Sequence, residues 1–189
     1  HLQNTFEQIK KGFGTIDFII HAVAYSDKNE LNGRYVDTSK DNFINSLSIS
    51  CYSFTRIAKI FQPIVNSGGS LVTLSFHGAN KVMPNYNVMG VAKAALETSV
   101  KYLSVDLGDQ GVRVNAISAG PMRTLAGAAI ANARDVFNYT SENSSLKRNV
   151  NLDELGNSAL YLVSDLSSAI TGEIHYVDCG FNIVGMPKS

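Results

Sequence analysis

Short apolar segments alternate with helical patterns along this chain, and this alternation narrows the possible folds more than any other feature. Three segments have the apolar character of strands that are covered on both faces: residues 16–24, 71–74 and 112–117. Residues 173–177 form a last short strand pattern. Helices that alternate with buried strands predict a parallel α/β sheet with right-handed crossovers, the doubly wound or Rossmann-type class.

The most regular helical pattern covers residues 40–65, with Thr38 as its predicted N-cap. Its buried face should carry the residues that recur at steps of three and four: Phe43, Leu47, Ser50, Phe54, Ile57 and Phe61. A later helix should span residues 151–163, because Asn151 followed by Glu154 is a capping pattern.

Composition limits both the number of domains and the classes of partner. With 189 residues, 44% of them hydrophobic, and no internal repeat or linker, residues 1–189 are expected to form a single domain. Sixteen basic residues balance sixteen acidic ones, which gives no electrostatic reason to expect nucleic acid or an anionic membrane as a partner. No apolar run is long enough to span a membrane, and no signal peptide is recognisable. Two isolated cysteines and scattered histidines predict a reduced, cytoplasmic protein without a metal site.

The glycine-rich phosphate loop of a dinucleotide-binding fold has no counterpart in this sequence. Such a fold opens with a strand, a glycine-rich turn and a helix that receives the pyrophosphate. The only G-x-G, at residues 12–14, ends a helical pattern and precedes a strand, which is the reverse order. We therefore expect a helix-end turn there, and a chain that lacks the first strands of the fold.

Tyr86 and Lys93 are seven residues apart in a predicted helix at residues 85–107, so both should project from nearly one face. A phenol can donate to a carbonyl oxygen that gains negative charge. A nearby ammonium can hold a ribose hydroxyl and lower the pKa of the phenol. The same spacing also fits an ordinary tyrosine beside a solvated lysine, so spacing alone leaves both interpretations open.

Three segments around this pair resemble those of bacterial-type enoyl-acyl-carrier-protein reductases, within the short-chain dehydrogenase superfamily. They are NYNVMG at residues 85–90, followed by AKA, then RVNAISAGPMRTL at residues 113–125, and DCGF at residues 178–181. Ordinary superfamily members place the tyrosine four residues before the lysine, where this chain has Met89. Enoyl reductases place it seven before, as here.

The resemblance implies NADH-dependent reduction of trans-2-enoyl-acyl-carrier-protein in type II fatty acid biosynthesis. Tyr86 would hydrogen-bond the thioester carbonyl and stabilise the enolate, while Lys93 would hold the nicotinamide ribose. It also implies further cofactor contacts by Ala22, Val23, Met122 and Thr124. NADPH stays open as the cofactor, because the family's ribose-reading residues precede the part that this chain matches.

The substrate side of the site follows from the same resemblance. Tyr25 would line the acyl pocket, and residues 125–130 would form a lid with Ala126 and Ile130 against the acyl chain. The small residues there fit a simple helix former equally well. The expected partners are the acyl carrier protein and three further copies of the chain in a homotetramer, with subunit contacts by the helices at residues 40–65 and 85–107.

The sequence departs from the family at Phe76, where many relatives have a second tyrosine, so Tyr86 should act without another phenol. His77 is adjacent, but a loop histidine is more often structural than catalytic. Two other functions are open to a chain with this pattern. An ordinary carbonyl-reducing dehydrogenase is disfavoured because Met89 cannot act as an acid, and a catalytically incompetent fragment could serve only in assembly.

Overall fold

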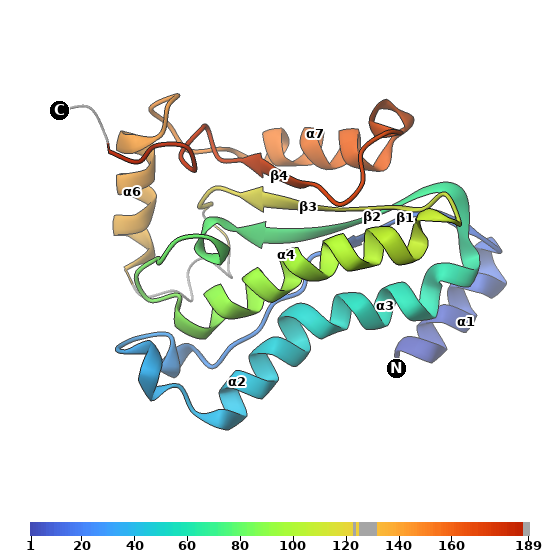
Figure 1. The fold of residues 1–189 in the computed structure, drawn as a ribbon, viewed down its shortest axis with the longest axis horizontal. Coiled ribbons are helices and arrows are strands. Elements are labelled where there is room, and N and C mark those ends of the chain that lie inside the picture. Colours follow the sequence, from blue (N-terminus) through green and yellow to red (C-terminus); the bar gives the residue numbers. More distant parts are fainter. Residues whose placement is uncertain (123, 125–131, 187–189) are drawn as a thin grey trace.

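A four-stranded parallel sheet forms the centre of the molecule (Figure 1). The structure is a computed structural model that describes residues 1–122, 124 and 132–186. The strands lie in the order β1-β2-β3-β4, and each neighbouring pair is parallel. Their bounds are Ile16–His21, Val65–Phe76, Arg113–Ala119 and Ile174–Val177. The predicted parallel α/β class is confirmed.

Helices cover both faces of this sheet and its carboxyl end (Figure 1). One face carries α1, α2, α3 and α4, which span Leu2–Phe13, Lys40–Leu47, Ser53–Phe61 and Asn87–Gly108. Helix α7, Leu152–Val163, lies on the opposite face, and α6, Ala133–Asn143, crosses the end to which the strands point. The 3₁₀ turns are η1, η2, η4, η5 and η6, at Lys28–Glu30, Tyr35–Asp37, Gln62–Ile64, His77–Ala79 and Asp165–Ser167.

Side-chain caps begin two of these helices. Asn151 accepts from the backbone N–H of Glu154, whose carboxylate accepts from the backbone N–H of Asn151, so the predicted capping box of α7 is confirmed. The N-cap of α2 is Ser39 rather than Thr38, and its hydroxyl accepts from the N–H of Asn42 at 3.2 Å. The prediction of Thr38 was wrong by one residue, because Thr38 instead donates to the carbonyl of Tyr35 in the preceding turn.

The single helix predicted at residues 40–65 is interrupted. A π-helical turn, η3 at Ser48–Tyr52, separates α2 from α3, and β2 already begins at Val65. The wider i→i+5 turn shifts the buried stripe along the helix. Three of the predicted residues, Ser50, Phe54 and Phe61, are buried. The full buried stripe is Asn42, Ser46, Ser50, Phe54, Ala58 and Phe61.

The largest apolar cluster lies between the sheet and α3 and α4. Phe54 from α3 and Leu96 and Val100 from α4 are fully buried against Leu71 of β2 and Val114 of β3. This packing holds α4 alongside the strands and antiparallel to them, so its first turn lies at their carboxyl ends (Figure 1). No helix within the described ranges is long and apolar enough to cross a membrane.

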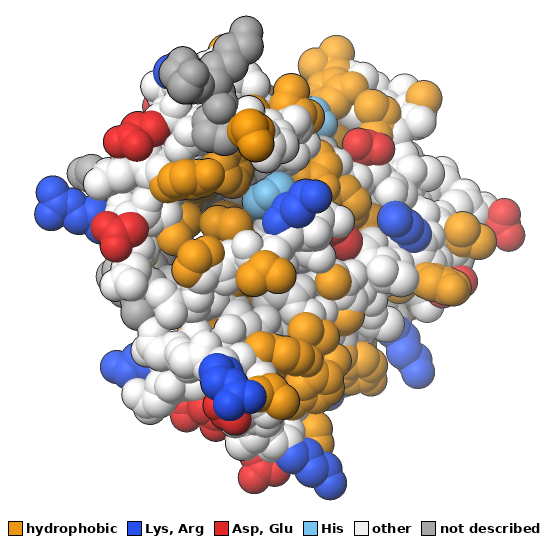
Figure 2. Space-filling view, turned by 60° about the vertical axis from the view of Figure 1, so that its left-hand side comes forward, with side chains coloured by type: hydrophobic (Ala, Val, Ile, Leu, Met, Phe, Trp, Pro, Cys, Tyr) orange, Lys and Arg blue, Asp and Glu red, His pale blue; other side chains and the backbone are white. Residues whose placement is uncertain are grey.

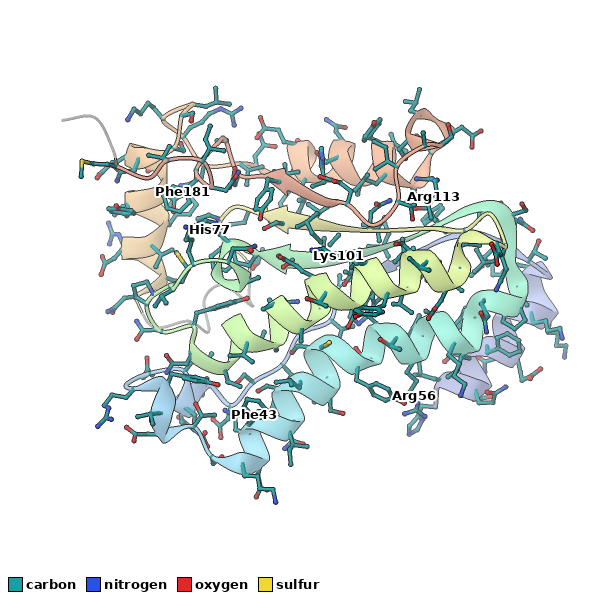
Figure 3. The ribbon with its side chains drawn as sticks, in the orientation of Figure 1. Phe43, Arg56, His77, Lys101, Arg113 and Phe181 are labelled. Atoms are coloured by element: carbon teal, nitrogen blue, oxygen red, sulfur yellow. The ribbon has the colours of Figure 1, made fainter. Side chains whose placement is uncertain are left out.

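On the other face, the buried guanidinium of Arg113 at the start of β3 ties the sheet to α7 (Figure 3). It donates to the carbonyl oxygens of Leu162 and Ser164 and to the hydroxyl of Ser167, at 2.7 to 3.2 Å. These bonds satisfy carbonyls at the end of α7, where a helix leaves its last C=O groups unpaired.

Candidate active site

A cavity of about 1540 Å³ opens at the carboxyl ends of the strands. The loop after β1, the ends of β2 and β3, the start of α4 and the start of α6 form its walls. Figure 2, which brings this end of the molecule forward, shows hydrophobic side chains gathered there around a hollow. Ligands of open α/β sheets bind at this edge. The cavity is larger than the roughly 300–1,000 Å³ of a typical single-ligand site, so it has room for a nicotinamide and a substrate together.

The structure brings together every described residue that the sequence predicts for the site. The cavity wall contains Ala22, Val23, Tyr25, Tyr86, Lys93, Met122 and Thr124. The predicted acyl-chain contacts Ala126 and Ile130 lie outside the described residues. The cavity therefore collects residues that are as much as a hundred positions apart in the chain.

Tyr86 lies immediately before α4 and not on its face. It is the N-cap residue, and the neighbouring Asn85 and Asn87 have positive φ angles of 57° and 35°. The expectation that Tyr86 and Lys93 share one face of a regular helix was wrong in this respect, because left-handed asparagines interrupt helical geometry. The pair nevertheless lines one cavity, since the helix begins at the next residue.

The ring of Tyr86 is held by close packing and is only 7% exposed. It meets the ring of Phe76 edge-on, with the centroids 5.0 Å apart. A Cβ atom added to Gly78 would lie 2.7 Å from Tyr86 Cε1, closer than atoms can approach. Phe76 therefore supports the ring of Tyr86, at the position where many relatives have a second phenol.

Burial controls the protonation of this phenol. It raises the pKa of Tyr86 well above its ordinary value of 10, and the negative charge of Glu97 acts in the same direction. The expectation that this pKa is lowered was wrong, because burial of the phenol and the charge of Glu97 both raise it. Tyr86 is thus a neutral hydrogen-bond donor at physiological pH.

Lys93 projects from the second turn of α4 and is 6% exposed. Its Nζ donates to the carbonyl oxygen of Leu74 on β2 at 2.8 Å. Burial lowers the pKa of Lys93 from 10.5 to about 8, although Cys51 and Glu97 oppose the change. Lys93 lines the cavity, and its ammonium has two N–H donors besides the one that pairs with Leu74.

Glu97 is a functional neighbour that the sequence did not single out. This buried carboxylate lies one helical turn after Lys93, and it accepts from Ser75 Oγ at 2.6 Å and from Asn80 Nδ2 at 3.0 Å. Its charge raises the pKa of both Tyr86 and Lys93. The i, i+4 spacing from Lys93 was the available signal, but only tertiary packing shows that the carboxylate is buried.

Two histidines lie near this edge of the sheet without a direct place in the chemistry. His21, at the end of β1, is buried and contacts the hydroxyls of Thr73 and Ser53, each at 2.8 Å. Burial, followed by the charge of Lys93, lowers the pKa of His21 to about 4, so its ring is neutral. His77 packs edge-on against Phe181, with the ring centroids 5.3 Å apart (Figure 3), and it is not among the residues that line the cavity.

The arrangement fits a nicotinamide cofactor. The buried ammonium of Lys93 can donate to ribose hydroxyls. The neutral phenol of Tyr86 and apolar side chains line the same cavity. The described residues contain no group of three or more histidine, cysteine or acidic side chains that could hold a metal ion. Such a site can supply hydrogen bonds and electrostatic stabilisation to a bound cofactor and a carbonyl substrate.

Comparisons with known proteins agree with this chemistry. The family model described as enoyl-(acyl carrier protein) reductase matches residues 1–182. Enoyl-[acyl-carrier-protein] reductase [NADH] 1 of Rhizobium meliloti is 58% identical over 181 residues, which are 96% of this chain and 66% of the relative. The corresponding protein of Rickettsia conorii is 54% identical over 187 residues, which are 99% of this chain and 72% of the relative.

Solved structures agree equally well. The crystal structure of the Anaplasma phagocytophilum reductase in complex with NAD has a TM-score of 0.96 and 56% identity, and the match covers all of this chain and 72% of that one. The Bacillus cereus reductase, solved with NADP⁺ and an indole naphthyridinone, has a TM-score of 0.95 and 43% identity over 98% of this chain and 72% of that one. This chain therefore spans 66% to 72% of the length of these relatives.

Proposed function

Because this chain belongs to the enoyl-(acyl-carrier-protein) reductase family, we propose that the complete protein reduces trans-2-enoyl thioesters on acyl carrier protein to acyl thioesters with NADH. This reaction belongs to type II fatty acid biosynthesis. The observation that carries the proposal is the shared cavity of Tyr86 and Lys93, in which the phenol is neutral and the lysine is buried.

The chemistry requires a donor at the thioester carbonyl. NADH, when bound, supplies a hydride for the β-carbon. As the electron pair of the double bond moves toward the carbonyl oxygen, Tyr86 donates its hydrogen bond to the developing enolate oxygen. The α-carbon of the enolate then takes up a proton from solvent, which completes the reduction. A phenol whose pKa is raised by burial keeps its proton through this step.

The remaining residues bind and orient. Lys93 would hold the nicotinamide ribose, and Ala22, Val23, Met122 and Thr124 would contact the cofactor along the sheet edge. Tyr25 would form part of the wall beside the acyl chain. Ala126 and Ile130 are proposed contacts of the same chain on the basis of family resemblance alone. NADPH is the second cofactor candidate, since the Bacillus cereus relative was solved with NADP⁺.

A carbonyl-reducing dehydrogenase is the second candidate reaction, and the chemistry of Met89 argues against it. Met89 occupies the usual position of the acid in such enzymes, but it is buried in a cluster with Leu31 and Val88 and has no acidic proton. The third possibility is a fragment that acts only in assembly.

The assembly itself is proposed to be a homotetramer of single-domain subunits in the cytoplasm. Exposed apolar side chains on the outer face of η3 and α4 support subunit contacts there: Tyr52, Tyr102 and Val105. Patches of this kind mark interaction surfaces. The free thiols Cys51 and Cys179 fit a reducing compartment. Analytical ultracentrifugation of the full-length protein would test the tetramer.

The decisive assay follows NADH absorbance with crotonyl thioester and the full-length protein, and it includes a simple ketone as the competing substrate. Tyr86→Phe should lower the turnover number about 10²-fold, because one transition-state donor is lost, with little change in NADH affinity. Lys93→Ala should weaken NADH binding. Reduction of the ketone but not of the enoyl thioester would overturn the proposal, and so would full activity of Tyr86→Phe. Tight NADH binding by residues 1–189 alone would count against an assembly-only role.

A further inference from the structure

Three polar residues form a buried ladder along α2 and the π-turn. Asn42, Ser46 and Ser50 follow one another at steps of four, and they are 5%, 0% and 0% exposed. The same buried stripe continues into α3 with the apolar residues Phe54 and Ala58. Burial of polar side chains is costly unless they are hydrogen-bonded, so the polar half of this stripe needs a partner.

Each of these three side chains forms hydrogen bonds with the segment that follows β1. Asn42 Oδ1 accepts from the backbone N–H of Asp27 at 2.9 Å and from Ser26 Oγ at 3.2 Å. Ser46 Oγ lies 3.0 Å from Ser26 Oγ. The ladder thus contacts consecutive residues of the loop, in the reverse order along the chain.

Ser50 makes the closest connection of the three. Its hydroxyl accepts from the backbone N–H of Tyr25 at 2.9 Å and donates to the carbonyl oxygen of the same residue at 3.0 Å. Tyr25 lies outside any strand, so Ser50 supplies the pairing that a sheet neighbour would otherwise provide for its peptide groups. Ser50 itself lies within the π-turn and is its buried residue.

The anchored segment is also a wall of the cavity. Tyr25, Ser26 and Asp27 all line it, together with residues from the ends of β2 and β3. We propose that Asn42, Ser46 and Ser50 are positioning residues. They hold the Tyr25–Asp27 segment of the cavity wall in the place that binding of the substrate's acyl chain requires. This inference rests on the proposed enoyl reduction, and it adds residues that do not touch the substrate.

The test compares Ser50→Ala with a matched control, Ser70→Ala, in the full-length protein. Ser70 is equally buried, and its hydroxyl donates to the carbonyl oxygen of Leu162, far from the cavity wall. Ser50→Ala should accelerate hydrogen exchange of the Tyr25 amide about tenfold and raise the KM for a long-chain enoyl thioester several-fold, with kcat within about twofold of the wild type. Ser70→Ala should leave both quantities unchanged.

A second variant covers the case in which Ser50→Ala does not fold. Asn42→Ala should accelerate exchange of the Asp27 amide, measured residue by residue, by a similar factor. Unchanged exchange in whichever variant folds would overturn the anchoring role, and faster exchange with an unchanged KM would overturn the positioning role. A wild-type protein that reduces no enoyl thioester would refute the proposed function and the substrate half of this inference, while the exchange rates would still decide the anchoring.

Discussion

Removal of the buried charge of Lys93 should change how the stability of the protein depends on pH. Burial lowers the pKa of Lys93 from 10.5 to about 8. At about 1.36 kcal/mol for each pKa unit, the charged form costs the folded protein about 3 kcal/mol at pH 7. Between pH 8 and pH 10.5 the unfolded chain binds more protons than the native state, so the free energy of unfolding rises with pH in this window.

The variant Lys93→Met removes this titration while it keeps a side chain of similar length. Relative to Lys93→Met, the wild type should gain about 2.5 kcal/mol of unfolding free energy between pH 7 and pH 10. The measurement is urea unfolding of the cofactor-free, full-length proteins at equal subunit concentration. Lys101→Met is the matched control, since Lys101 lies on the exposed side of the same helix (Figure 3).

The comparison can refute the reasoning directly. If the free energies of unfolding of the wild type and of Lys93→Met change by the same amount between pH 7 and pH 10, then burial does not lower the pKa of Lys93. A Lys101→Met protein with the altered pH dependence expected for Lys93→Met would refute the assignment of the effect to burial.

Three further predictions follow from the packing and the protonation of the site and from the start of α7. Gly78→Ala should displace the ring of Tyr86 and lower turnover with enoyl thioester at least about tenfold, since misplacement by about 1 Å is costly; Gly12→Ala, where an added Cβ meets nothing within 4 Å, should leave turnover unchanged. The free energy of unfolding should fall as pH drops from 6.5 to about 4, because unfolded His21 takes up a proton before the native ring does. The same titration of His21→Gln should show a flatter slope, and equal slopes would contradict the lowered pKa. Asn151→Ala should cost about 1 kcal/mol in urea unfolding through loss of the α7 cap, with unchanged turnover per folded subunit; a loss of turnover would contradict a purely structural cap.

Local signals in the sequence were sufficient for the framework of the fold. Apolar runs covered on both faces predict a parallel sheet wherever helices alternate with them, and the capping box at Asn151 depends only on residues within one turn. The grouping of Tyr86, Lys93 and Tyr25 in one site was predicted from the resemblance to enoyl reductases, and in the structure all three line the cavity at the carboxyl edge of the sheet.

The properties that tune the site depend on contacts between distant segments. Along residues 40–61 the hydrophobic pattern favoured Phe43 and Leu47 as the buried face, whereas the π-turn and the loop after β1 bury Asn42 and Ser46 instead. The helix propensities of that segment do not reveal its hydrogen-bond partners, which lie 15 and 20 residues earlier in the chain.

The protonation of Tyr86 has the same origin. From the spacing to Lys93, a lowered pKa was the natural expectation, but the buried ring beside Phe76 and Glu97 has a raised pKa. A pKa reflects desolvation and the nearby charges together, and both are set by which elements pack around a residue. The sequence by itself determined which groups could react and at which edge of the sheet they meet, and only the tertiary structure decided how deeply each is buried and therefore which form it takes.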